Sequence, residues 1–154
     1  MKKFLVIGNP IEHSLSPKLH NYWIKTNNLN EIYLKLETHE SDMPELSKSI
    51  KKGELAGLNV TVPFKKTIIP YLDILSGDAL RTQSVNTVSL SKGNLIGDNT
   101  DIDGFEFGIK KINYDVTDKI VLILGAGGVV PSIICALKRM NASKIVLSLS
   151  LIHI

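Results

Sequence analysis

Short hydroxyl, amide and charged side chains recur in this sequence beside the ends of predicted strands and helices. Ser14 and Ser16 lie in the segment HSLSP, just before an apolar helical pattern that has Pro17 in its first turn. Two hydroxyls, free backbone N–H groups and the positive end of a helix dipole would together suit a carboxylate. In the alternative interpretation Ser16 only caps the helix and Ser14 fills the loop.

A second polar pair lies in GLNVTVPFK, residues 57–65. In an extended strand Asn59 and Thr61 point to the same face, while the residues between and beside them are apolar. Open α/β sheets bind ligands at the carboxyl ends of their strands. The pair therefore predicts a ligand-binding site at this edge of the sheet, rather than two polar residues that only face solvent. Lys65 follows a turn, and its position alone does not separate a functional lysine from surface charge.

Two further polar candidates follow. Asn86 lies in SVNT and Asp101 lies in DNTD, the segment 98–101. DNTD is also typical of a turn followed by a helix cap. The local sequence does not decide which acid is catalytic.

The segment VLILGAGG predicts a nucleotide-binding turn between a strand and a helix. Gly125 would permit the tight turn, and Gly127 would let the backbone approach a pyrophosphate at the helix start. The third glycine position holds Val130, and a plain strand–turn–helix connection is the alternative. No acid follows at the end of the next strand, which favours NADP over NAD, although no arginine is present there either.

Strand and helix patterns alternate along the chain, which indicates an α/β fold with a mainly parallel sheet. We expect strands at 4–8, 32–36, 58–62, 85–90, 94–97, 119–124 and 144–147, and helices from Ser16, at 43–52, within 64–80, at 101–111 and at 129–140. The expected organisation is a three-layer α/β substrate-binding domain at 1–100, a connecting helix and linker at 101–117, and a truncated Rossmann-like βαβ unit at 118–154.

The end of the sequence is unusual. One βαβ unit cannot close a doubly wound sheet, and LSLSLIHI carries no turn, cap or charge. We therefore expect a fragment whose last half-dozen residues are not native coding sequence.

Composition excludes several functional classes. The 154 residues carry a net charge of only +3, without a basic run interleaved with aromatics, so no nucleic-acid partner is expected. The apolar runs are too short for a membrane span, and no spacing of metal ligands occurs. Cys135 is expected to be a buried structural thiol. We expect a cytoplasmic protein.

Five motifs together resemble one family. GNPIEHSLSPKLHN, GLNVTVPFK, SVNT, GDNTDIDG and VLILGAGG occur in the order and spacing of shikimate dehydrogenases, over residues 3–147. The resemblance implies NADP-dependent, reversible reduction of 3-dehydroshikimate to shikimate, a step of chorismate and aromatic amino-acid biosynthesis.

The resemblance also implies roles for individual residues. Lys65 and Asp101 would be the catalytic pair. The residues implied to bind substrate are Ser14, Ser16, Asn59, Thr61, Lys65, Asn86 and Asp101. The NADP pyrophosphate would lie against Gly125, Ala126, Gly127, Gly128 and Val129.

Two departures from the family pattern stand out. The Asn-Arg-Thr motif that reads the NADP phosphate is replaced by Leu149-Ser150-Leu151, and later family features are absent. Activity of the chain alone is therefore in question. A quinate/shikimate dehydrogenase and a non-catalytic module that binds a shikimate-like ligand are the alternatives, and a homodimer is left open.

Overall fold

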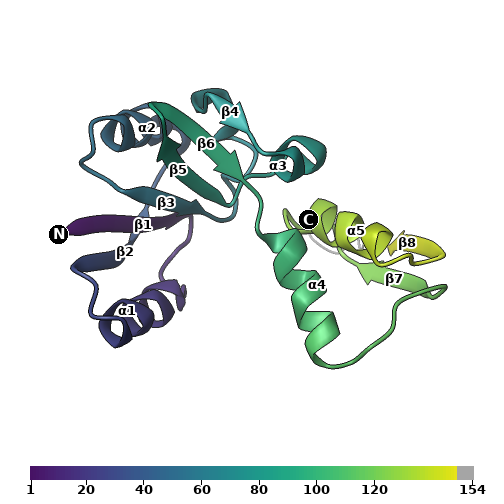
Figure 1. Ribbon diagram of the computed structural model, residues 1–154. Helices are drawn as coiled ribbons and strands as arrows, with labels where there is room; N and C mark the ends of the chain where they lie inside the picture. The colour runs from purple at the N-terminus through teal and green to yellow at the C-terminus, as the bar shows by residue number, and fades with distance from the viewer. Residues whose placement is uncertain (149–154) are drawn as a thin grey trace. The chain divides into compact units, whose positions relative to one another are not determined.

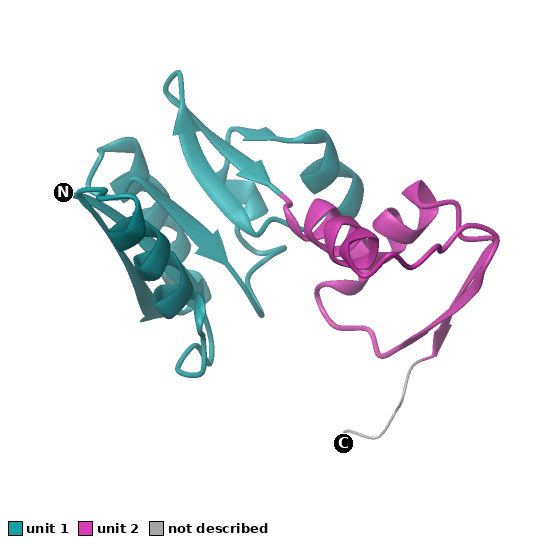
Figure 2. Ribbon diagram, turned by 60° about the horizontal axis from the view of Figure 1, so that its bottom comes forward, with its two compact units in different colours: residues 1–98 teal, residues 99–154 magenta. Residues whose placement is uncertain are grey.

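The computed structural model describes residues 1–148, and the chain divides into two compact units, Met1–Asp98 and Asn99–Ile154 (Figure 2). The predicted division at 1–100, 101–117 and 118–154 stays a prediction. The predicted non-native segment at the end of the chain lies outside the described residues. Within residues 1–148, no helix is long and apolar enough to cross a membrane.

The first unit is built on one mixed sheet (Figure 1). Within the described residues its strand order is β2 (Glu31–Glu37), β1 (Lys2–Gly8), β3 (Gly57–Val60), β5 (Thr87–Ser91), β6 (Asn94–Asp98) and β4 (Ile74–Leu75). The pairs β1–β2, β1–β3 and β4–β6 are parallel, whereas β3–β5 and β5–β6 are antiparallel. The helical elements are α1 (Ser16–Thr26), η1 (Glu40–Asp42), α2 (Met43–Lys51), η2 (Ile69–Tyr71) and α3 (Gly77–Thr82).

Strand β1 shows why the unit has three layers. Successive side chains of a strand point to opposite faces. Leu5 and Ile7 therefore join the main core, with Met43 and Ile50 of α2. Val6 faces the other way, into a smaller cluster with Ile11, Tyr33, Phe4 and Ile24 of α1. Helices α1 and α2 consequently cover opposite faces of the sheet (Figure 1), as expected from the alternation of strands and helices.

The segment 64–80 differs from the helical turns that were predicted there. It contains η2, the short strand β4 and only the start of α3. The carboxylate of Asp73 accepts the Leu95 N–H at 2.7 Å and the ammonium of Lys51 at 2.9 Å. The Leu95 N–H above all, and Lys51, lower the pKa of Asp73. These contacts between distant residues seat β4 beside β6, and local propensity does not encode them.

Helix α1 is fastened to β2 at one residue, Tyr33. The side chain of Asn21 donates to the Tyr33 carbonyl at 2.7 Å and accepts the Tyr33 N–H at 3.0 Å. The imidazole of His20 stacks on the Tyr33 ring, with centroids 4.1 Å apart and planes inclined by 4°. Burial in this stack lowers the pKa of His20 from 6.5.

The second unit contains the predicted βαβ pattern. Helix α4 (Asp101–Lys111) precedes β7 (Ile120–Leu124), α5 (Val130–Arg139) and β8 (Lys144–Ser148), and β7 and β8 are parallel. Helices α4 and α5 pack through Ile102, Phe105, Cys135 and Ala136, so the predicted burial of Cys135 is confirmed. Alternate side chains of β7, those of Ile120, Leu122 and Leu124, are exposed.

Gly8, at the end of β1, allows a close approach that a side chain would block. A Cβ there would lie 2.7 Å from Cγ2 of Thr61, 2.9 Å from Cδ1 of Ile11 and 3.0 Å from the Val62 carbonyl oxygen. Gly8→Ala should therefore lower the free energy of unfolding by about 1–3 kcal/mol, as overpacking does, in a urea titration. Gly77→Ala is the matched control, because a Cβ there meets nothing within 4 Å. Equal stability of the Gly8 variant and the wild type would contradict this packing.

The His20 stack predicts a dependence of stability on pH. The folded-state pKa of His20 lies below the unfolded value of 6.5, so the folded chain binds fewer protons than the unfolded chain. The stabilisation is present above pH 6.5 and is lost as the pH falls through the folded-state pKa. His20→Phe keeps an aromatic ring and removes the titration. Unfolding midpoints measured from about pH 7.5 to about pH 5 should fall less in this variant than in the wild type. If the unfolding midpoints of the variant and the wild type fell equally with pH, the titration of His20 would not contribute to the pH dependence of stability.

Candidate functional site

The carboxyl ends of β1 and β3 are joined by backbone hydrogen bonds. The Thr61 N–H donates to the Ile7 carbonyl at 2.9 Å, and the Asn9 N–H donates to the Val62 carbonyl at 3.0 Å. The Asn9–Pro10 and Val62–Pro63 peptide bonds are both cis. Thr61 lies just after β3, which ends one residue before it, and its side chain is half-buried. The loops that follow β1 and β3 therefore lie side by side.

The segment HSLSP leads from β1 into α1. The predicted cap at Ser16 is wrong: Leu15 is the N-cap and Ser16 is the first helical residue. The Ser16 N–H donates instead to Oγ of Ser14 at 3.3 Å, because a serine two residues earlier in a turn can reach it. Both serines are half-buried at a helix start without acidic residues in its first turn, which suits an anion.

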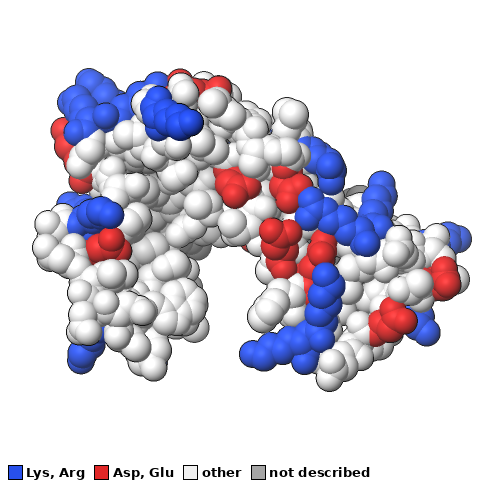
Figure 3. Space-filling model, viewed as in Figure 1, with Lys and Arg blue, Asp and Glu red and all other residues white. Residues whose placement is uncertain are grey.

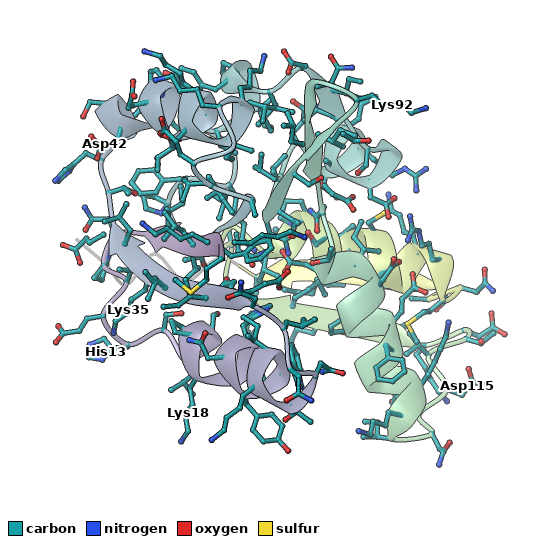
Figure 4. All side chains as sticks on the ribbon, turned by 60° about the vertical axis from the view of Figure 1, so that its left-hand side comes forward. His13, Lys18, Lys35, Asp42, Lys92 and Asp115 are labelled. Atoms are coloured by element: carbon teal, nitrogen blue, oxygen red, sulfur yellow. The ribbon has the colours of Figure 1, made fainter. Side chains whose placement is uncertain are left out.

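The loop before these serines is tied to the neighbouring strand. The Lys35 ammonium on β2 donates to the Glu12 carbonyl. Figure 4 labels Lys35 and the adjacent loop residue His13. The loop is thus fastened on both sides, to β2 here and to the end of β3 through Asn9.

Three side chains at the end of β3 and the start of β5 form a hydrogen-bonded cluster. The Nδ2 of Asn59 donates to the Asn86 carbonyl and to Oγ1 of Thr87, each at 3.1 Å. The Thr87 hydroxyl lies 3.0 Å from Oδ1 of Asn86. The antiparallel pairing places Asn59 directly opposite Thr87. The structure therefore brings Asn59 and Asn86 together, although they are far apart in the sequence.

Lys65 is anchored beside this cluster. Its carbonyl accepts the Val85 N–H at 2.8 Å, one residue before Asn86. The turn between β3 and Lys65 is closed by the Phe64 N–H, which donates to the Thr61 carbonyl at 2.9 Å. Lys65 itself is half-buried, unlike the exposed Lys66. The segments that carry Thr61, Lys65 and Asn86 are consequently held together.

Asp101 belongs to the second unit, as the first residue of α4. The N–H of Asp101 donates to Oδ1 of Asn99 at 3.0 Å, so the predicted turn in DNTD is present, whereas the N-cap residue Thr100 makes no side-chain capping hydrogen bond. The Nδ2 of Asn99 donates to the buried Oγ of Ser132 on α5 at 2.9 Å. Asn99 therefore holds the start of α4, and with it Asp101, against the first turn of α5.

The glycine turn of the second unit fits a pyrophosphate. Gly125 has a φ of +101°, which a residue with a side chain rarely adopts, and its N–H donates to the Ser148 carbonyl at 2.9 Å. A Cβ at Gly127 or Gly128 would meet nothing within 4 Å, so the protein's own packing does not require glycine there. Gly127, Gly128, Ala126 and Val129 are exposed in front of α5, whose positive dipole end suits an anion.

Sequence reasoning missed three residues of these networks. Tyr33 donates its hydroxyl to Oδ1 of Asn59 at 2.7 Å, but in the sequence it is one apolar position of an alternating strand. Thr87 and Asn99 lie inside the motifs SVNT and GDNTDIDG, and only their distant partners distinguish them from neighbouring polar residues. The substrate, catalytic and cofactor roles of the predicted residues stay predictions.

Charged side chains and a hollow elsewhere on the surface do not indicate a different functional site. On the face shown in Figure 3, the lysines and arginines of the first unit are separated by uncharged surface. A hollow of about 440 Å³ lined by Met1, Lys2, Asn30 and Gly53 lies at the amino ends of β1 and β2, away from the candidate residues. Within residues 1–148, no group of three or more acidic, histidine or cysteine side chains could hold a metal ion.

Comparison with known proteins agrees with the resemblance of the motifs. The model of the shikimate dehydrogenase substrate binding domain matches residues 6–88. A shikimate dehydrogenase (NADP(+)) from Pelagibacter ubique is 56% identical over 147 residues, which are 96% of this chain and 56% of that protein. The chain spans about half the length of the curated relatives it matches.

Solved structures show the same fold. Shikimate dehydrogenase 1 from Peptoclostridium difficile has a TM-score of 0.89 at 34% identity, and the match covers 96% of this chain and 54% of that one. Shikimate 5-dehydrogenase from Thermus thermophilus, in complex with NADP(H) and shikimate, has a TM-score of 0.86 at 31% identity, covering 96% and 55%. Since the matched residues 6–88 are more than half of its 154 residues, the chain belongs to the shikimate dehydrogenase family.

Proposed function

We propose that the protein is an NADP-dependent shikimate dehydrogenase, an oxidoreductase that interconverts 3-dehydroshikimate and shikimate in chorismate and aromatic amino-acid biosynthesis. The observation that carries the proposal is the joining of Asn59, Thr87 and Asn86 by hydrogen bonds beside the anchored Lys65 segment. The curated relatives are named for the same activity.

The substrate carboxylate would bind at the start of α1. Hydroxyl groups of Ser14 and Ser16 donate to its oxygens, and the helix dipole favours its negative charge. The cross-link from Asn9 to Val62 keeps this loop beside the end of β3. A carboxylate held there leaves the ring to extend towards the polar side chains of β3 and β5.

The ring hydroxyls would meet Asn59, Thr61, Asn86 and Asp101. Several short polar side chains from different segments are needed, because a polyol must be fixed at several points before its reacting carbon is placed accurately. Amide and hydroxyl groups can each donate and accept, which matches alcohol groups.

Lys65 and Asp101 would form the catalytic pair. Reduction of the 3-keto group leaves negative charge on its oxygen, and the Lys65 ammonium stabilises this charge and gives up a proton to it. The Asp101 carboxylate would accept a hydrogen bond from a substrate hydroxyl. The residues that would hold NADPH, which would supply the hydride, are Gly125, Ala126, Gly127, Gly128 and Val129.

Substrate assays distinguish two alternative functions from the proposed one. A quinate/shikimate dehydrogenase would turn over quinate as well, and a binding module would hold shikimate without oxidising it. Lys65 and Asp101 favour an enzyme, since binding alone would not need both. A cytoplasmic location belongs to the same proposal, and a homodimer stays a prediction.

Shikimate should bind the 154-residue chain without NADP, because the proposed carboxylate contacts lie in the first unit. Ser14→Ala should weaken this binding by about 1–3 kcal/mol, the usual loss for a hydrogen bond to a charged group. Calorimetry or ligand-observed NMR measures the dissociation constant. Ser91→Ala, at the exposed far end of β5, is the control. Absence of binding by folded wild type would refute the proposed function.

Lys65→Ala should reduce turnover far more than it raises KM. A group that acts on the developing alkoxide matters mainly in the transition state, and general acid–base catalysis is typically worth about 10²–10⁴-fold in kcat. The assay uses residues 1–147 joined to the C-terminal half of the Pelagibacter ubique relative. Lys66→Ala is the matched control, since Lys66 is the exposed neighbour. If the kcat of the Lys65→Ala chimera stayed within about threefold of the kcat of the unsubstituted chimera, Lys65 would be ordinary surface charge and not a catalytic residue.

A further inference from the structure

Tyr33 carries a buried hydroxyl that the proposed chemistry does not use directly. The side chain is only 3% exposed and lies in the apolar cluster of Val6 and Ile11 under α1. A phenol in such surroundings needs a hydrogen-bond partner. It reaches across β1 to Oδ1 of Asn59 at 2.7 Å, its only polar partner among the described hydrogen bonds.

The partners of Asn59 fix the direction of this bond. The Asn86 backbone carbonyl can only accept, so the carboxamide of Asn59 must turn its Nδ2 towards it. The second Nδ2 proton is donated to Oγ1 of Thr87. Oδ1 consequently faces Tyr33, which must donate. Burial raises the pKa of Tyr33 to about 12, so the hydroxyl keeps its proton at neutral pH.

The same direction continues to Asn86. Oγ1 of Thr87 accepts from Asn59, and its own proton is donated to Oδ1 of Asn86 at 3.0 Å. A one-way chain therefore runs from the Tyr33 hydroxyl through Asn59 and Thr87 to the Asn86 carboxamide. Within this chain both N–H groups of Asn59 are used, so Asn59 meets a ligand only as an acceptor.

We infer that Tyr33 is a positioning residue of the proposed substrate site, which orients the Asn59 and Asn86 carboxamides towards the ring hydroxyls of the substrate. The inference rests on the proposed function. Asn21 and His20 hold Tyr33 from α1, the helix that starts at the proposed carboxylate site. One residue thus couples the segment that binds the carboxylate to the side chains that recognise the hydroxyls.

The test uses Tyr33→Phe in the 154-residue chain and two ligands. Shikimate carries the carboxylate and the ring hydroxyls, whereas cyclohex-1-ene-1-carboxylate carries the carboxylate alone. The variant should bind shikimate about tenfold more weakly, in the range of a lost neutral hydrogen bond, and bind cyclohexenecarboxylate as the wild type does. Tyr22→Phe is the matched control, because it removes the hydroxyl of a tyrosine on α1 that is 65% exposed. The inference is overturned if the variant binds both ligands more weakly by the same factor, or if it binds both as tightly as the wild type does.

A second variant and a second measurement keep the test decisive. Thr87→Val breaks the chain one link later and should give the same selective loss if Tyr33→Phe fails to fold. The side-chain amide protons of Asn59 should be slow to exchange with solvent in the wild type and faster in Tyr33→Phe by NMR. Unchanged exchange overturns the inference, even if the wild type binds no shikimate and the proposed function fails.

Discussion

The candidate site depends on the close parallel pairing of β1 and β3 at their carboxyl ends. The bond from the Thr61 N–H to the Ile7 carbonyl extends the ladder one residue past β3, and Gly8 leaves room for the Thr61 side chain. The loops that follow the two strands must then leave the sheet together, since Asn9 also bonds to Val62. Any group that widened this contact would separate the serines of HSLSP from the polar side chains of β3.

The polar side chains at the edge are held by hydrogen bonds, which matters because they are only half-buried. A half-buried carboxamide can rotate unless each of its polar atoms has a fixed partner. Asn59 has such partners on both sides, in Tyr33 and in the Asn86–Thr87 segment. The site is thereby supported by residues that lie in the α1 cluster, so helix packing and ligand recognition share the same contacts.

In the second unit, too, an amide side chain joins two segments by hydrogen bonds. Asn99 is almost fully buried and bonds both to the start of α4 and to Ser132 in the first turn of α5. The start of α4, with Asp101, and the first turn of α5 are therefore joined through one side chain within this unit. A buried amide with satisfied partners fixes geometry more firmly than apolar contact alone, because its hydrogen bonds are directional.

The sequence by itself determined the alternation of strands and helices, the βαβ pattern and the family, because hydrophobic periodicity and glycine turns are local properties. It also determined which polar residues to examine. Only the tertiary structure decided that Ser14 rather than Ser16 accepts the hydrogen bond at the start of α1, that β4 lies within 64–80, and that Tyr33 bonds to Asn59. Each of these depends on atoms whose positions are set by strand pairing or by turn geometry, and the order of residues along one segment does not specify them.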